Sequence, residues 1–199
     1  SAAFRARIAL NLKGLAYQPL FVHLRKGEHR GAEYAGVNAQ APVPALELDD
    51  GVRIAQSLAI IEYLDEAHPE PRLIPRTATA RARVRSLSLL VACEIHPLNN
   101  LRALQYLRKQ LGQNEEQVSV WYRHWIADGF AKLEAALAGS SETGTYCHGS
   151  TPSMADCCLV PQVFNARRYE FDPGPYPTIM RVFDECMQLG AFQRAQPSK

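Results

Sequence analysis

Three prolines within residues 68–76, HPEPRLIPR, divide this chain into two parts with different hydrophobic patterns. Proline fixes one backbone angle and lacks an N–H donor, so such a segment neither continues a helix nor pairs in a sheet. Stretches with helical and strand periods alternate before it, and only helical periods follow it. The pattern predicts an α/β domain over residues 1–69, a linker over 70–76 and an all-helical domain over 77–199.

The first domain begins with a helix and a strand. Phe4, Ile8 and Leu12 recur at helical spacing, which predicts a helix over residues 4–15 that ends at a glycine. Residues 17–24, YQPLFVHL, predict a strand, and its proline places it at a sheet edge or at the start of the strand.

Two short strands and a second helix complete this domain. Residues 44–48 and 52–55 are expected to pair as a hairpin through an Asp-Gly turn, and residues 57–67 to form a helix. A mixed sheet of this kind also needs a strand ahead of the first helix, because a parallel neighbour is reached only by a crossover. We therefore expect that the natural protein begins a few residues before Ser1 and that the first strand of the sheet lies there.

The second domain is predicted to contain long helices only. Apolar residues at spacings of three and four place them at 77–111, 114–137, 153–169 and 178–189. Pro97 is expected to kink the first of them. Asn114 with Gln117 and Ser153 with Asp156 have the spacing of capping boxes, and Trp121 and Trp125 are expected to form a core stripe.

Composition excludes several classes of protein. The net charge is only +2 and the basic residues are scattered, so we expect no nucleic-acid partner. No apolar run is long enough to span a membrane, and no signal peptide opens the chain. The five cysteines lack metal or disulfide spacing, which predicts free buried thiols, no metal site and a cytoplasmic protein.

Motifs along the whole chain resemble one family. These are SAAFRARIALNLKGLAY, NAQAPVPAL, AQSLAIIEYLDE, PRLIP, EIHPLNNLR, TPSMADCCLVPQVFNARRY and PYP. They resemble the zeta-class glutathione transferases and their bacterial maleylacetoacetate and maleylpyruvate isomerase relatives. The resemblance implies a thioredoxin-like N-terminal domain that holds glutathione, an all-helical C-terminal domain that supplies the second-substrate pocket, and a homodimer.

The resemblance implies a glutathione site in the first domain. Val43, before a cis Pro44, is expected to pair with the tripeptide backbone, and Gln56 and Ser57 to hold its γ-glutamyl end. The start of a helix suits this carboxylate because its N–H groups are unpaired. His29 and Gln40 match further contact positions in the relatives. The structural alternatives are an ordinary trans proline, a Ser57 that only caps its helix, and a solvated loop histidine.

Two residues of the first helix are candidates for the thiol chemistry. Ser1 stands at the helix start, where a hydroxyl donor lowers the pKa of a thiol. In the family register the usual thiolate partner lies one residue before Ser1, and the alternative is a disordered terminal residue. Arg5 is a second candidate near the thiol, with plain surface charge as the alternative.

The helical domain supplies the remaining candidates. His96 and Asn100 surround the kink at Pro97 and match the glutathione or substrate pocket of the family, where the alternative is a satisfied helix-face histidine. Arg168 is expected to bind a carboxylate of a dicarboxylate substrate through its planar fork, whereas Arg167 should point elsewhere. The alternative for the arginine pair is a surface ion pair.

The expected activity is glutathione-dependent cis–trans isomerisation of maleylacetoacetate to fumarylacetoacetate. Maleylpyruvate isomerases of the family can carry arginine directly after the second asparagine, where this chain has Leu101, which slightly favours maleylacetoacetate. The open alternatives are maleylpyruvate isomerisation, conjugation of glutathione to small electrophiles, and a non-enzymatic binding module on the same fold.

Overall fold

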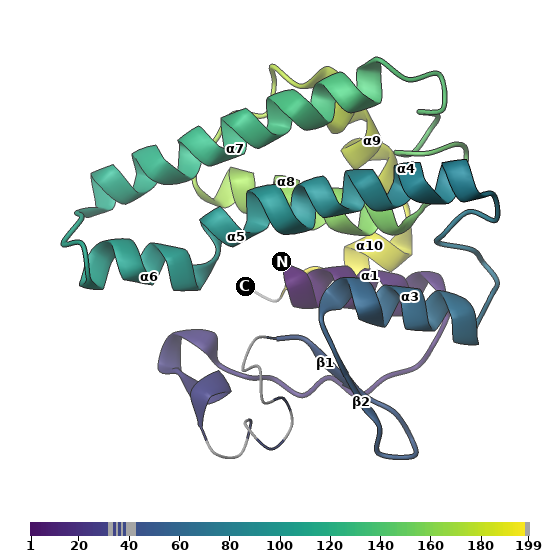
Figure 1. Cartoon of the computed structure of the whole chain (residues 1–199), viewed down its shortest axis with the longest axis horizontal. Coiled ribbons are helices and arrows are strands. Elements are labelled where there is room, and N and C mark those ends of the chain that lie inside the picture. Colours follow the sequence, from purple (N-terminus) through teal and green to yellow (C-terminus); the bar gives the residue numbers. More distant parts are fainter. Residues whose placement is uncertain (32–33, 35, 37, 39–42, 198–199) are drawn as a thin grey trace.

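The computed structural model describes residues 1–31, 34, 36, 38 and 43–197 and arranges them in two parts, one above the other in Figure 1. The described elements of the first part are α1 (Ala2–Leu12), the short 3-10 turns η1 (Leu24–Lys26) and η2 (Glu28–Arg30), β1 (Ala45–Glu47), β2 (Arg53–Ala55) and α3 (Ser57–Ala67). Those of the second part are α4 (Ala78–Leu89), η3 (Leu90–Ile95), α5 (His96–Asn99), α6 (Leu101–Lys109), α7 (Glu115–Ala138), α8 (Met154–Arg168), α9 (Pro177–Gln188) and α10 (Gly190–Arg194).

The hairpin and the helix after it confirm the prediction from sequence. β1 and β2 pair antiparallel, with Leu46 opposite Ile54. The turn uses Gly51 at a φ of 84°, a left-handed conformation that glycine adopts without steric cost. α3 has the predicted bounds. α1 begins two residues earlier than predicted and gives way to Gly14 at a φ of 68°.

The predicted strand at residues 17–24 is wrong. This stretch has no strand structure and passes directly into η1, and Leu20 and Phe21 are 83% and 82% exposed. A strand exists only through a ladder of hydrogen bonds to a neighbour. In the described part of the chain the sheet contains β1 and β2 alone, so this β-favouring stretch pairs with no strand there.

The predicted helix at residues 77–111 is interrupted near Pro97. α4 passes into a π-helical segment, η3, and Pro97 then lies in the first turn of α5. A proline has no N–H to give to the preceding turn, which explains why the regular α-helical bonding is lost here. A second break follows at Asn100, whose ψ is 164° and whose side-chain oxygen accepts the Ala103 N–H at 3.0 Å.

Both predicted capping boxes are confirmed, at the starts of α7 and α8. The predicted tryptophan stripe is confirmed only in part. Trp121 is half-buried and packs against the core, Trp125 is half-buried, and the fully buried face of α7 includes Tyr122, Ile126 and Phe130. The short helix α10 was not predicted, because residues 190–194 are too few to show a period.

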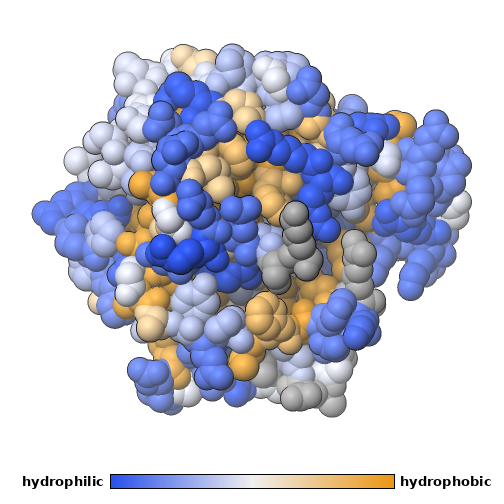
Figure 2. All heavy atoms as spheres, turned by 180° about the vertical axis from the view of Figure 1, so that it is seen from behind, coloured by the Kyte–Doolittle hydropathy of each residue, from blue (hydrophilic) through white to orange (hydrophobic). Residues whose placement is uncertain are grey.

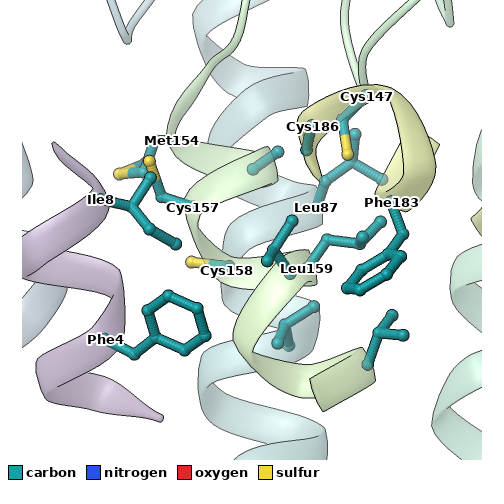
Figure 3. Close-up of a cluster of buried hydrophobic side chains, with 14 of the residues drawn as sticks. Phe4, Ile8, Leu87, Cys147, Met154, Cys157, Cys158, Leu159, Phe183 and Cys186 are labelled. Carbon is teal, nitrogen blue, oxygen red and sulfur yellow. The ribbon is translucent and has the colours of Figure 1, made fainter. Parts of the chain in front are cut away.

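The core joins the two parts along α1 and α8. Figure 3 shows Phe4 and Ile8 of α1 facing α8, where Cys157, Cys158 and Leu159 lie among the buried side chains. All five cysteines are free thiols, and four of them are buried, whereas Cys93 is exposed. Their sulfur atoms therefore fill core space, and burial raises the pKa of the Cys157 thiol.

A buried ion pair fixes the segment between the two parts. The Lys13 ammonium donates to Asp65 at 2.6 Å and to the carbonyls of His68 and Pro71, each at 2.7 Å. Asp65 in turn accepts the N–H groups of Leu73 at 2.7 Å and Ile74 at 3.2 Å. The Leu73 carbonyl then accepts the N–H of Met154, the first residue of α8, at 2.8 Å. We call this network the Lys13–Asp65 clamp.

The surface is mixed. Figure 2 shows that hydrophilic side chains cover most of the face opposite to that of Figure 1, with hydrophobic atoms visible in smaller areas between them. No helix in the described ranges is both long enough and apolar enough to cross a membrane.

We predict that Lys13→Met lowers the free energy of unfolding by about 3–5 kcal/mol, because it leaves the Asp65 carboxylate buried without its cation. Denaturant unfolding of the ligand-free protein measures this loss. Lys132→Met is the control, since its ion pair with Asp128 is exposed and should contribute below about 1 kcal/mol. Equal losses in the two variants would contradict a special role for the clamp.

Candidate active site

The centre of the site is the Ser1 hydroxyl, where three chain segments meet. The Asn165 side-chain amide of α8 donates to the Ser1 Oγ at 2.7 Å, and the His96 Nδ1 of α5 lies 3.1 Å from the same oxygen. A hydroxyl has one proton and two lone pairs. Because Asn165 occupies one lone pair, the Ser1 proton is directed either to His96 or to a ligand.

His96 is a neutral group in this site. Burial, and after it the positive charge of Arg5, lowers the pKa of His96 to about 3. The imidazole therefore stays uncharged at neutral pH and can donate or accept a hydrogen bond at Nδ1 according to its tautomer. In the tautomer that donates to Ser1, both serine lone pairs are taken and the hydroxyl proton is left for a bound anion.

Arg5 connects this centre to the start of α3. Its side chain is 2% exposed, and its Nη1 donates to the Ser57 Oγ at 3.4 Å. Its Nε and Nη2 atoms are buried and have no hydrogen-bond partner. Arg5 is therefore not a surface charge, which was the alternative interpretation of this residue.

Gln56 and Ser57 lie at the junction of β2 and α3, as predicted. Gln56 is the N-cap residue at a φ of 70° and ψ of 119°, an unusual conformation for a residue with a side chain. Ser57 is the first helical residue, is 5% exposed, and its side chain makes no capping hydrogen bond. The alternative that Ser57 only caps α3 is therefore wrong.

The peptide bond between Val43 and Pro44 is cis, as predicted, directly before β1. His29 lies in η2, half-buried, with its Nδ1 atom enclosed and without a hydrogen-bond partner. The structure brings neither Val43 nor His29 into a hydrogen bond with the Ser1 centre. Gln40 lies outside the described residues.

Arg168 stands at the exposed end of α8, one turn beyond Asn165 and on the same face. Three residues correspond to a rise of about 4.5 Å along the helix. Burial lowers the pKa of the Ser1 amino group most, and the Arg168 charge is one of the positive charges that lower it further. Burial raises the pKa of the Tyr122 hydroxyl, as does Tyr169, and the Arg168 charge opposes the rise. Arg167 points away, with its guanidinium 4.6 Å from the centre of the Phe183 ring, as the helix rotation predicts.

The two asparagines of the EIHPLNNLR stretch behave differently. The Asn100 side chain caps α6, so its oxygen is already engaged. Asn99 is buried, and both polar atoms of its side chain lack a hydrogen-bond partner. Sequence reasoning missed Asn99 and Asn165. The spacing of three between Asn165 and Arg168 was the one signal that placed Asn165 on the same face as a candidate.

This arrangement suits a ligand with several negative charges. The start of α3 with Ser57 offers N–H and hydroxyl donors to a carboxylate, Ser1 offers a hydroxyl donor, and Arg168 offers a bidentate fork at the far end. The unpartnered donors of Arg5 and the unpartnered His29 nitrogen fit a polar anionic tripeptide such as glutathione. No group of side chains in the described segments has the arrangement of a metal site.

Comparison with known families agrees with this geometry. Residues 1–67 match the family model of the glutathione S-transferase N-terminal domain, and residues 125–185 match that of the C-terminal domain. The chain is 50% identical to the maleylpyruvate isomerase of Ralstonia sp, over 98% of this chain and 91% of that protein. It is 43% identical to the maleylacetoacetate isomerase of Pseudomonas aeruginosa, over 100% of this chain and 92% of that protein.

Solved structures show the same relationship. The holo structure of a maleylpyruvate isomerase, described as a bacterial zeta-class glutathione S-transferase, has a TM-score of 0.94 and 48% identity, covering 98% of this chain and 91% of that one. A maleylacetoacetate isomerase from Methylobacterium extorquens, with bound malonate and glutathione, has a TM-score of 0.95 and 39% identity, covering 99% of this chain and 94% of that one. The chain belongs to the glutathione S-transferase family, in the zeta-class group of maleylacetoacetate and maleylpyruvate isomerases.

Proposed function

We propose that this protein is a glutathione-dependent cis–trans isomerase that converts maleylacetoacetate to fumarylacetoacetate. The observation that carries the proposal is the position of Arg168 one turn beyond Asn165, the residue that binds the Ser1 hydroxyl. A thiol held at Ser1 then lies beside an arginine that can hold a substrate carboxylate. The Methylobacterium extorquens relative binds both malonate, a dicarboxylate, and glutathione.

Bound glutathione supplies the chemistry: its thiolate adds to the cis double bond, the resulting single bond rotates, and elimination returns the trans product and the thiolate. The residues of this chain hold the reactants in place for that step. Ser1 donates its proton to the sulfur, with Asn165 fixing the direction of the hydroxyl. Arg168 holds a carboxylate of the substrate while the bond rotates.

The other candidates bind the tripeptide. Gln56 and Ser57 hold the γ-glutamyl end, the Val43 backbone pairs with the cysteinyl unit, and His29 and Gln40 contact the remainder. His96 supports Ser1 within the thiol site. The side-chain oxygen of Asn100 caps α6, so Asn100 acts on the site indirectly, by fixing the break between α5 and α6. We also propose that the protein is a cytoplasmic homodimer, as the resemblance implies.

Maleylpyruvate is the second candidate substrate. The Ralstonia relative, at 50% identity, is a maleylpyruvate isomerase, whereas Leu101 follows the second asparagine here, where maleylpyruvate isomerases can carry arginine. Arg102, the next residue, is exposed on α6. Both substrates present a carboxylate to Arg168, so they share the proposed mechanism.

We predict isomerisation of maleylacetoacetate only when glutathione is present, with glutathione recovered unchanged. The measurement follows loss of the maleyl double-bond isomer with the full-length protein, with and without glutathione, and with maleylpyruvate in parallel. Faster turnover of maleylpyruvate would reassign the substrate. Formation of a stable glutathione conjugate would favour a transferase, and no reaction with either substrate would contradict the proposed function.

We predict that Arg168→Ala lowers kcat/KM for the maleyl substrate by roughly ten- to a thousandfold, or about 1.4–4 kcal/mol of transition-state binding. Glutathione affinity should change little, since its proposed contacts lie in the first part of the chain. Arg167→Ala is the matched control, because Arg167 packs on Phe183 instead. A fully active Arg168→Ala enzyme would show that another group anchors the substrate.

We predict that Asn165→Leu lowers kcat/KM by about tenfold, because the Ser1 hydroxyl loses the donor that directs its proton. Steady-state kinetics with varied glutathione measure the effect, which should lie mainly in kcat. Asn11→Leu is the control, since the Asn11 amide donates to the Ala191 carbonyl at 2.9 Å, away from Ser1. An unchanged Asn165→Leu enzyme would remove Asn165 from the thiol site.

A further inference from the structure

Arg5 is a buried cation without a counter-ion. Its side chain is 2% exposed, and of its donor atoms only Nη1 has a contact, a long one of 3.4 Å to the Ser57 hydroxyl. Moving a charge out of water costs several kcal/mol unless a partner and hydrogen bonds compensate for it. Because Arg5 lies beside the candidate active site, a bound anion can supply the missing counter-charge.

The acidic residues of the helices packed against α1 are held elsewhere. On α3, Asp65 binds Lys13 and Glu62 binds Arg85. The third α3 acid, Glu66, is exposed. On α8, Asp156 accepts from Ser153 and from the Cys147 N–H.

The remaining charged side chains of these helices and their caps are positive: Arg7 on α1, Lys13 at its C-cap, Arg167 and Arg168 on α8, and Arg194 on α10. Among the described residues, no carboxylate therefore neutralises Arg5.

Two of the titratable groups coupled to Arg5 belong to the Ser1 centre. They are the Ser1 amino group and His96, whose Nδ1 lies 3.1 Å from the Ser1 hydroxyl. Cys158 of α8 is a third. Burial raises the pKa of the Cys158 thiol, and the Arg5 charge is the foremost influence that lowers it. The Arg5 charge thus opposes the rise that burial causes in the pKa of a neighbouring thiol of this protein.

We infer that Arg5 is the counter-charge that holds the bound glutathione sulfur as a thiolate, an inference that rests on the proposed function. The γ-glutamyl carboxylate is the other anion within reach, but Ser57 and the N–H groups of α3 already serve it, and the Arg5–Ser57 contact is long. When the S–H bond breaks, the proton passes to solvent. His96 does not keep it, because its pKa is about 3.

The first test measures the pKa of glutathione bound to the full-length protein from the ultraviolet absorbance of its thiolate. Arg5→Met should raise this pKa by about 1–2 units, the usual effect of removing one close opposite charge, and Arg5→Lys should raise it less. Arg7→Met is the matched control, since Arg7 is half-buried on the same helix and its Nε donates to the Ala195 carbonyl. An unchanged thiol pKa in Arg5→Met would overturn the inference.

The second test separates the thiolate from the γ-glutamyl carboxylate. At a pH where the bound thiol is ionised, Arg5→Met should weaken glutathione binding by about tenfold if the thiol pKa rises by one, and by about a hundredfold if it rises by two. Binding of S-methylglutathione, which keeps both carboxylates and has no ionisable thiol, should be unchanged. Equal losses for the two ligands would assign Arg5 to the carboxylate and overturn the inference.

The third test uses ligand-free protein. Arg5→Met should unfold at the same or a higher temperature than wild type, because it removes an unpaired buried charge. A lower melting temperature would show that Arg5 is structural and would overturn the inference. If Arg5→Met does not fold, the pKa of the glutathione thiol bound to Arg5→Lys is the deciding measurement. These measurements use no maleyl substrate, so they stand whether or not the isomerase assay succeeds.

Discussion

The rest of the structure depends on the buried ion pair between Lys13 and Asp65. Lys13 ends the first helix, Asp65 lies near the end of α3, and together they hold both the carbonyl and the N–H groups of the proline-rich segment. Prolines remove the regular hydrogen bonds that would otherwise organise such a segment, so side chains must supply them. The clamp thus holds this connecting segment in one position, although the segment contains no helix or strand.

The clamped segment also positions α8, and α8 in turn positions the site. The Leu73 carbonyl receives the first N–H of α8, which sets the position of that helix against α1. Asn165 and Arg168 then lie on the face of α8 that meets Ser1. The break around Pro97 brings His96 to the same point from the other side. Three segments far apart in sequence therefore share one hydroxyl.

The charge distribution of the site explains both its ligand class and its energetic cost. Positive charge is concentrated on Arg5 and Arg168, and the neighbouring carboxylates are bound elsewhere. An anionic tripeptide and the proposed dicarboxylate substrate would complete this balance of charge. Active sites commonly keep such uncompensated groups, because stability and function favour different residues at one position.

The sequence by itself determined the elements whose signals are local. Turn chemistry, caps and helix rotation account for the hairpin, the bounds of α3, both capping boxes, the interruption at Pro97 and the direction of Arg167. Only the tertiary structure decided that residues 17–24 are not a strand, that Asn165 binds Ser1 and that Arg5 is buried. A strand forms only beside a neighbouring strand, and a side chain is buried only by the elements that pack over it. Both depend on residues distant along the chain, and local periodicity does not encode those contacts.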